Sequence, residues 1–353
     1  MNQSDQNICE RVLSPGRSMG QLKLIGIQRA GTLMLALPMN TSLALATLGL
    51  YQPQKLKGRL FRFFLSVVVK CGLHRRASKI SFEIGDRGLF SGLKEVTDCQ
   101  KFGFLLSGAD SKHRKLIGLC EIGGQRMVVK AGCDEAIKVV TQEYEIQCNL
   151  IDQIPGVPSC QLFFKIDRGV AYVSELVYGR SPKGSNDDAV VFSLIRQWLG
   201  VGKRGRVSEL LDWDGLQNCL NEKEKEYFEL LQNLEVINPT VHGDFTPWNI
   251  KIDKEGGIKV LDWEHATLAG MPGWDWLHYH VQRLKLVEGA RGQVIIDHCR
   301  NLMVAPPFAE YLKEAGLEGH EDALLGSYLF FTAKVHNYPR EEEIQFWLST
   351  RQK

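Results

Sequence analysis

The segment that most constrains this chain is a polar loop between two short apolar stretches. It reads Val-His-Gly-Asp-Phe-Thr-Pro-Trp-Asn-Ile at 241–250, and Ile-Lys-Val-Leu-Asp follows at 258–262. Three hydrogen-bond acceptors stand at defined spacing, since Asn249 lies five residues after Asp244 and Asp262 thirteen residues after Asn249. The pattern predicts two short strands near 239–262 that flank a polar turn.

Phosphoryl transfer from ATP requires such a set of side chains. One carboxylate has to sit at the incoming hydroxyl, while an amide and a second carboxylate hold Mg²⁺ over the phosphates. Hard oxygen ligands suit Mg²⁺, which keeps part of its water shell. We therefore predict that Asp244 is catalytic and that Asn249 and Asp262 bind the metal.

Spacing and context resemble the catalytic loop of the aminoglycoside phosphotransferase and choline kinase family, which has a protein-kinase-like fold. The family pattern is H-G-D-x4-N followed by an apolar strand that ends in Asp, and this chain matches it at 242–249 and 258–262. The resemblance spans about residues 100–282. It implies a two-lobed α+β fold, with a small antiparallel-sheet N-lobe, a mostly helical C-lobe and an extra N-terminal extension.

The part of the chain upstream of this loop fits the same resemblance. Apolar runs at 102–106, 115–122 and 127–130 predict an antiparallel meander. Its last strand places Lys130 where the family has a lysine that holds the α- and β-phosphates of ATP. In the family a glutamate on the next helix fixes this lysine, and the register favours Glu143 over Glu145.

Two further segments would contact the nucleotide if the resemblance holds. The turn between the first two strands of the meander is where the family's phosphate-covering loop belongs, which assigns Ser107, Gly108 and Ser111 to ATP binding. The strand near 172–177 resembles the linker between the lobes, where backbone groups bind the adenine edge. Glu175 C=O and Val177 N–H are the expected pair.

Two side chains near the loop have less specific interpretations. His242 is expected to order the catalytic loop by packing and hydrogen bonding, because Asp244 is the better general base. Asp275 either braces the loop from behind or is a solvated residue at a helix start.

Charge is unevenly distributed along the 353 residues. Residues 11–82 contain twelve Lys or Arg and no Asp or Glu, and we predict that residues 1–82 form a basic extension.

Within this extension, a helix is expected over 56–73. The interpretation we favour is that its apolar side, with Phe63 and Phe64, covers the main domain. The alternative is a helix that lies on anionic lipid through residues 56–79.

The other domain boundaries follow from the family resemblance and from the length of the chain, which suggests about two domains. Residues 83–178 are expected to form the N-lobe and residues 179–353 the helical C-lobe.

Nine cysteines without a C-x-x-C pair favour a reducing cytoplasm, with contact to the inner face of the membrane as a further option. The basic segment lacks any recognised nucleic-acid-binding module, so no nucleic-acid partner is expected.

These observations predict an ATP- and Mg²⁺-dependent phosphotransferase that acts on a hydroxyl of a small molecule. The family phosphorylates aminoglycosides, choline-like alcohols and sugars, and no motif here selects one of them. The alternative is a catalytically inactive kinase-like protein that binds nucleotide and docks on a membrane or a partner.

Overall fold

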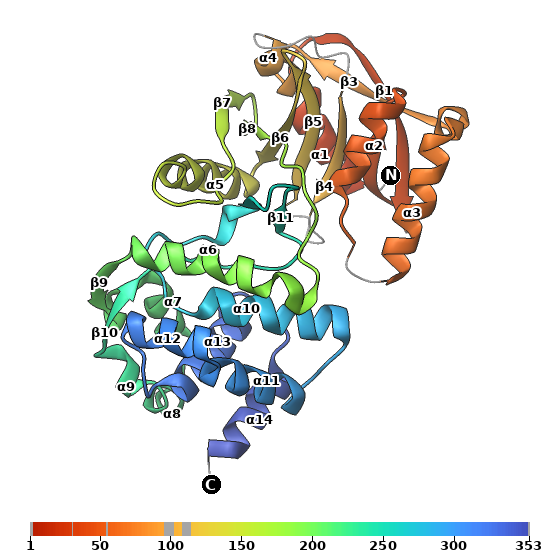
Figure 1. The fold of residues 1–353 in the computed structure, drawn as a ribbon. Coiled ribbons are helices and arrows are strands. Elements are labelled where there is room, and N and C mark those ends of the chain that lie inside the picture. The colour runs from red at the N-terminus through yellow and green to blue at the C-terminus, as the bar shows by residue number, and fades with distance from the viewer. Residues whose placement is uncertain (1–2, 30, 54–55, 95–101, 108–113, 352–353) are drawn as a thin grey trace. The chain divides into compact units, whose positions relative to one another are not determined.

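The computed structural model describes residues 3–29, 31–53, 56–94, 102–107 and 114–351. The chain divides into two compact units (Figure 1). Unit 1 consists of Met1–Asn149 and Pro158–Val177, and unit 2 of Leu150–Val157 and Tyr178–Lys353. Unit 1 is built on an antiparallel sheet and unit 2 is mostly helical, which confirms the expected α+β fold.

One eight-stranded antiparallel sheet forms the centre of unit 1, in the order β3-β1-β2-β4-β5-β6-β8-β7. Its strands are β1 Ser18–Arg29, β2 Thr32–Leu37, β3 Lys79–Gly85, β4 Gly103–Ser107, β5 Lys115–Ile122, β6 Gln125–Cys133, β7 Cys160–Ile166 and β8 Gly169–Glu175. The predicted meander is β4-β5-β6. Leu35 of β2 pairs with Leu105 of β4, so the sheet continues across residue 82, where the sequence suggested a boundary.

Side chains alternate between the two faces of this sheet, and helices cover both. On one face α1 (Gln3–Leu13) and α4 (Leu89–Lys94) share an apolar core with Phe104 and Val129. On the other face α2 (Thr41–Leu50) packs on Ile25 and Leu35. Helix α5 (Ala136–Leu150) covers the end formed by β7 and β8.

Helix α3, Leu56–Lys70, corrects one expectation. Its apolar side does not cover the main domain, because Leu60, Phe63, Phe64 and Val67 are all exposed. Val69 is the one fully buried residue of the helix and joins the core shared with α2. Sequence periodicity identified the apolar side correctly but gave no information on what that side contacts.

Unit 2 contains most of the helices and two short two-stranded antiparallel sheets, β9–β10 and β11–β12. Its strands are β9 Lys203–Arg206, β10 Glu235–Asn238, β11 Ile250–Ile252 and β12 Ile258–Val260. Its α-helices are α6 Asp188–Gly200, α7 Leu211–Cys219, α8 Glu222–Glu226, α9 Glu229–Gln232, α10 Trp274–Gln282, α11 Gln293–Val304, α12 Pro306–Ala315, α13 Glu321–Lys334 and α14 Glu341–Arg351. The predicted polar loop directly precedes β11.

Candidate active site

The polar loop at 241–249 is held at both ends by backbone hydrogen bonds within unit 2. At its start, Val241 forms an isolated antiparallel bridge with Thr267. At its end, the backbone O of Asn249 accepts from the N–H of Leu261 at 2.7 Å. The loop and the residues that follow β12 are therefore tied together.

Gly243 and Asp275 fix the turn inside the loop. Gly243 has φ +79°, and a Cβ at this position would lie 2.3 Å from the backbone O of His265. Both the left-handed backbone and this close approach require glycine. The carboxylate of Asp275, buried at the start of α10, accepts from the N–H of His242 at 2.7 Å and from that of Gly243 at 3.0 Å. Asp275 therefore braces the loop and is not a solvated helix start.

His242 is an ordering residue, as expected from the sequence. Its Nδ1 accepts from the N–H of Asp244 at 3.3 Å, and its Nε2 therefore carries the proton and donates to the backbone O of Leu261 at 3.0 Å. Burial lowers the pKa of His242 to about 4. The ring is neutral near pH 7, and both nitrogens are used in holding the loop.

Asp244 is surrounded by hydrogen-bond donors. Its Oδ2 accepts from Asn249 Nδ2 at 2.9 Å. Its Oδ1 accepts from His278 Nε2 at 3.2 Å and from the hydroxyl of Tyr338 at 3.1 Å. The Asp244 side chain keeps 19% of its surface exposed.

The charge state of this carboxylate follows from the same contacts. Burial opposes ionisation of Asp244, but the hydrogen bond from His278 and the electrostatic interactions with His278 and His242 together outweigh burial and hold the pKa below its ordinary value. Burial and the negative charge of Asp244 raise the pKa of Tyr338. Asp244 is therefore an ionised acceptor at neutral pH, and Tyr338 is a protonated donor.

Asn249 and Asp262 supply oxygen atoms suited to a hard cation. Asn249 Nδ2 donates both to the backbone O of Asp244, at 3.0 Å, and to its Oδ2, which makes Oδ1 the acceptor end of the amide. Asp262 follows β12 with φ +70°, a backbone conformation that few non-glycine residues adopt. Its charge acts on both Asp244 and His242. An amide oxygen and a carboxylate fit the ligand chemistry of Mg²⁺.

Unit 1 contains the predicted lysine–glutamate pair. Lys130 lies on β6 between Val129 and Ala131, whose side chains belong to the core on the opposite face, so it points to the face covered by α5. There its Nζ forms an ion pair with Glu143, which is fully buried. Glu145 is exposed on the same helix. Of the two glutamates weighed from the sequence, Glu143 is thus the partner of Lys130.

The other predicted nucleotide contacts are less informative. Gly108 and Ser111 lie outside the described residues. Ser107 ends β4, and its hydroxyl donates to the backbone O of Lys115 at 3.4 Å. Glu175 ends β8, and its side chain accepts from the N–H of Ser159 at 2.9 Å. Val177 is the last residue of unit 1. The binding roles of these residues stay predictions.

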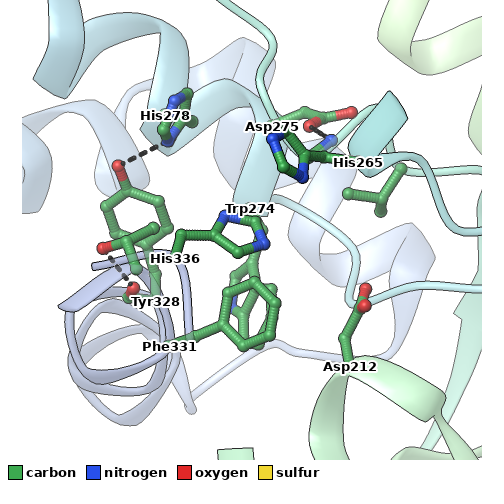
Figure 2. A pocket seen from close by; sticks show the side chains of 11 residues that line it. Asp212, His265, Trp274, Asp275, His278, Tyr328, Phe331 and His336 are labelled. Atoms are coloured by element: carbon green, nitrogen blue, oxygen red, sulfur yellow. Dashed lines mark hydrogen bonds between the residues drawn. The ribbon is translucent and has the colours of Figure 1, made fainter. Parts of the chain in front are cut away.

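Sequence reasoning missed His278 and Tyr338, the two donors to Oδ1 of Asp244. His278 lies three residues after Asp275 on α10, so a helical pattern would have placed it on the same side as the bracing residue. Tyr338 lies in the segment between α13 and α14, and no local pattern links it to the loop. His278 is itself oriented by Tyr328, whose hydroxyl donates to its Nδ1 at 3.1 Å (Figure 2).

A small cavity in unit 2 adjoins the residues that hold the loop (Figure 2). Its lining comprises Asp212, Val241, Gly243, His265, Trp274, Asp275, His278, Tyr328, Phe331, Thr332 and His336. Burial raises the pKa of Asp212 to about 6, although the hydroxyl of Thr267 donates to it. The cavity is thus mostly aromatic and imidazole in character, with the buried carboxyl group of Asp275 and the half-buried one of Asp212.

Comparisons with known proteins give low similarities. No protein-family model and no curated protein sequence matches this chain. Among solved structures it is similar to the aminoglycoside phosphotransferase APH(4)-Ia, with 11% identity, a TM-score of 0.46 and coverage of 74% of this chain and 94% of that chain.

Two other solved structures are similar to a comparable degree. A protein assigned as a fructosamine-3-kinase from Haemophilus somnus shows 13% identity and a TM-score of 0.44, over 70% of this chain and 92% of its own. The spectinomycin phosphotransferase APH(9)-Ia, in complex with ADP and spectinomycin, shows 13% identity and a TM-score of 0.38, over 75% of this chain and 98% of its own. These three TM-scores all lie below 0.5, so the similarities carry no conclusion about the function of this chain.

Proposed function

We propose that the protein is an ATP- and Mg²⁺-dependent phosphotransferase whose acceptor is a hydroxyl group of a small molecule. The observation that carries the proposal is the environment of Asp244. An ionised carboxylate is fixed by Asn249 on one oxygen and receives a neutral hydroxyl, that of Tyr338, on the other.

In this proposal Asp244 orients the acceptor hydroxyl and takes its proton. The carboxylate accepts hydrogen bonds and donates none, and the bond from Tyr338 shows that a hydroxyl fits at 3.1 Å from Oδ1. An acceptor hydroxyl in an equivalent position would be aligned for attack on the γ-phosphorus. Its proton would pass to Asp244 as the new O–P bond forms and the bond between the γ-phosphorus and the β,γ-bridging oxygen breaks, with ADP as the leaving group.

Asn249 and Asp262 would hold Mg²⁺. When bound, the ion would neutralise charge on the transferring phosphoryl group. Asn249 suits this task because its Nδ2 is bonded to Asp244, which orients the amide and makes Oδ1 the ligand atom. One residue thereby connects the predicted metal ligands to the catalytic carboxylate.

Lys130 would bind the α- and β-phosphates of ATP. A lysine in a largely buried position is costly unless it is paired, and Glu143 provides the partner. The pair fixes the ammonium group while leaving it positively charged. Ser107 and the loop that follows it would cover the phosphates, and the backbone of Glu175 and Val177 would bind adenine.

The decisive experiment is a screen of hydroxylated metabolites for ATP consumption, with and without Mg²⁺, on the wild-type protein and on Asp244→Asn. We expect Mg²⁺-dependent turnover with at least one acceptor. Base catalysis contributes about 10²–10⁴-fold, so Asp244→Asn should lower kcat by that factor while ATP affinity is nearly unchanged.

Two outcomes would contradict this proposal. Turnover of Asp244→Asn close to the wild-type rate would remove the carboxylate from the reaction. Mg²⁺-dependent ATP binding without consumption in the presence of any acceptor would support the alternative, an inactive nucleotide-binding protein.

A further inference from the structure

Helix α3 presents an uncovered apolar strip on unit 1. Leu56, Leu60, Phe63, Phe64 and Val67 recur at helical spacing and therefore share one side of the helix. Phe63 is 62% exposed and Phe64 65%, and their rings contact each other edge to face. Exposed apolar residues that gather on one surface are unusual in a monomeric soluble protein and indicate an interaction site.

The opposite side of α3 attaches the helix to its unit. Val69 is buried and Leu65 is partly buried, and both belong to the core formed with Ile25, Leu35 and Leu48. The apolar strip thus faces away from unit 1 because a different strip already contacts the core. Docking of the helix onto its own sheet does not explain the exposed phenylalanines.

Positive charge borders this strip. Lys57, Arg59 and Lys70 on α3 are exposed, as are Arg76 and Lys79 just beyond it. The whole stretch from residue 11 to residue 82 contains no acid. Large aromatic and aliphatic side chains flanked by Lys and Arg are typical of helices that lie in a membrane interface.

The exposed apolar strip and its basic border together distinguish between possible binding partners of α3. A second copy of the chain packed strip against strip would bring the basic borders of the two copies together, which costs free energy. An anionic bilayer matches both features, since phosphates meet the cations while the acyl boundary takes the phenylalanines. Among the described helices none is long and apolar enough to cross a bilayer, and α3 has 15 residues.

We propose that α3 is an interfacial helix that docks the protein on an anionic phospholipid surface. Phe63, Phe64 and Leu60 insert at the acyl boundary, and Arg59 and Lys70 contact the lipid phosphates. This docking is independent of the proposed catalytic activity, because no predicted site residue lies on α3.

The test is co-sedimentation of the full chain with vesicles of phosphatidylcholine alone or with about one third phosphatidylglycerol. We expect binding to the anionic vesicles, weaker binding at high salt because of screening, and none above background to the neutral vesicles. Phe63→Ser with Phe64→Ser should reduce binding at least tenfold, and so should Arg59→Glu with Lys70→Glu.

The matched control is Leu211→Ser with Leu230→Ser, two residues of unit 2 that are as exposed as the phenylalanines. This variant should bind like the wild type, and all variants should keep the wild-type melting temperature because the positions are exposed.

Failure of the wild type to bind anionic vesicles, or retained binding by the Phe63/Phe64 variant, would overturn the proposal. So would concentration-dependent self-association that the same two substitutions abolish, since the strip would then be an interface between copies.

Discussion

The hydroxyl of Tyr338 donates to Oδ1 of Asp244 at 3.1 Å, on the same carboxylate oxygen that receives Nε2 of His278. The tyrosine comes from the segment between α13 and α14, far along the chain from the loop that carries Asp244. A hydroxyl of the protein therefore occupies the kind of position that the acceptor hydroxyl would take in the proposed reaction. If the proposal holds, an incoming acceptor would have to displace Tyr338 or share the oxygen with it.

We accordingly expect Tyr338→Phe to strengthen acceptor binding. A hydrogen bond to a charged group contributes about 1.5–3 kcal/mol, so removing the competing hydroxyl should lower the acceptor KM by about tenfold or more. Initial-rate kinetics with the acceptor found by the metabolite screen provide the measurement. An unchanged KM with a reduced kcat would show instead that Tyr338 positions Asp244 during the reaction.

The pairing of Lys130 with Glu143 gives a prediction with a built-in control. Glu143→Gln leaves a buried lysine without its ion pair, and breaking a buried pair typically costs about 3–5 kcal/mol. Glu145→Gln alters an exposed residue on the same helix and should stay within about 0.5 kcal/mol of the wild type. Urea denaturation measures both variants.

ATP affinity of the same two variants tests the role of the pair. It should fall for Glu143→Gln, in which Lys130 is no longer fixed, and stay unchanged for Glu145→Gln. Equal ATP affinity of the two variants, with Glu143→Gln still folded, would assign the pair a purely structural role.

Asp262→Ala should weaken binding of Mg²⁺–ATP while leaving the fold intact. The substitution removes a carboxylate expected to ligate the ion, so phosphate charge remains uncompensated. Isothermal calorimetry with ATP should show that Mg²⁺ enhances wild-type binding and has little effect on the variant. Asp297→Ala, at an exposed position of α11, is the control and should behave like the wild type. An unchanged response to Mg²⁺ would make Asp262 a structural carboxylate.

The sequence was most informative where structure is local. The β4-β5-β6 meander follows from apolar runs, because its strands pair with neighbours within a short stretch of chain. The Lys130–Glu143 pair was expected from the family resemblance, and helix register served only to favour Glu143 over Glu145. The order of residues within the loop likewise indicated that Asn249 and Asp244 belong to one site.

These local patterns do not predict contacts between residues that are far apart in the sequence. The bridge from Leu35 to Leu105, which joins the basic extension to the sheet, depends on strand edges that periodicity does not identify. The exposure of Phe63 depends on which side of α3 meets the core, and two sides of that helix carry apolar residues. The donor role of Tyr338 depends on where a distant loop packs.

His242 should make the stability of unit 2 dependent on pH. Burial lowers its pKa from 6.5 to about 4 in the folded protein. Between these values the unfolded chain binds a proton at this residue and the folded chain does not. The contribution of neutral His242 to the free energy of unfolding is therefore complete above pH 6.5. It is lost as the pH falls toward 4, and the free energy of unfolding then decreases by about 1.4 kcal/mol per pH unit.

The substitution His242→Gln isolates this contribution, because glutamine does not titrate and retains an N–H for the backbone O of Leu261. Asp275, whose pKa burial raises to about 7, accepts from the backbone N–H of residue 242 in both proteins, so its titration cancels in the comparison. The variant is expected to be less stable than the wild type at pH 7, and this difference should shrink by about 2 kcal/mol at pH 5. Urea denaturation at the two pH values measures this difference, with His320→Gln, at a partly exposed position, as the control.

A pH-independent difference between His242→Gln and the wild type would mean that the ring takes up a proton as readily in the folded loop as in the unfolded chain. His242 could not then hold the loop by accepting at Nδ1 from the N–H of Asp244.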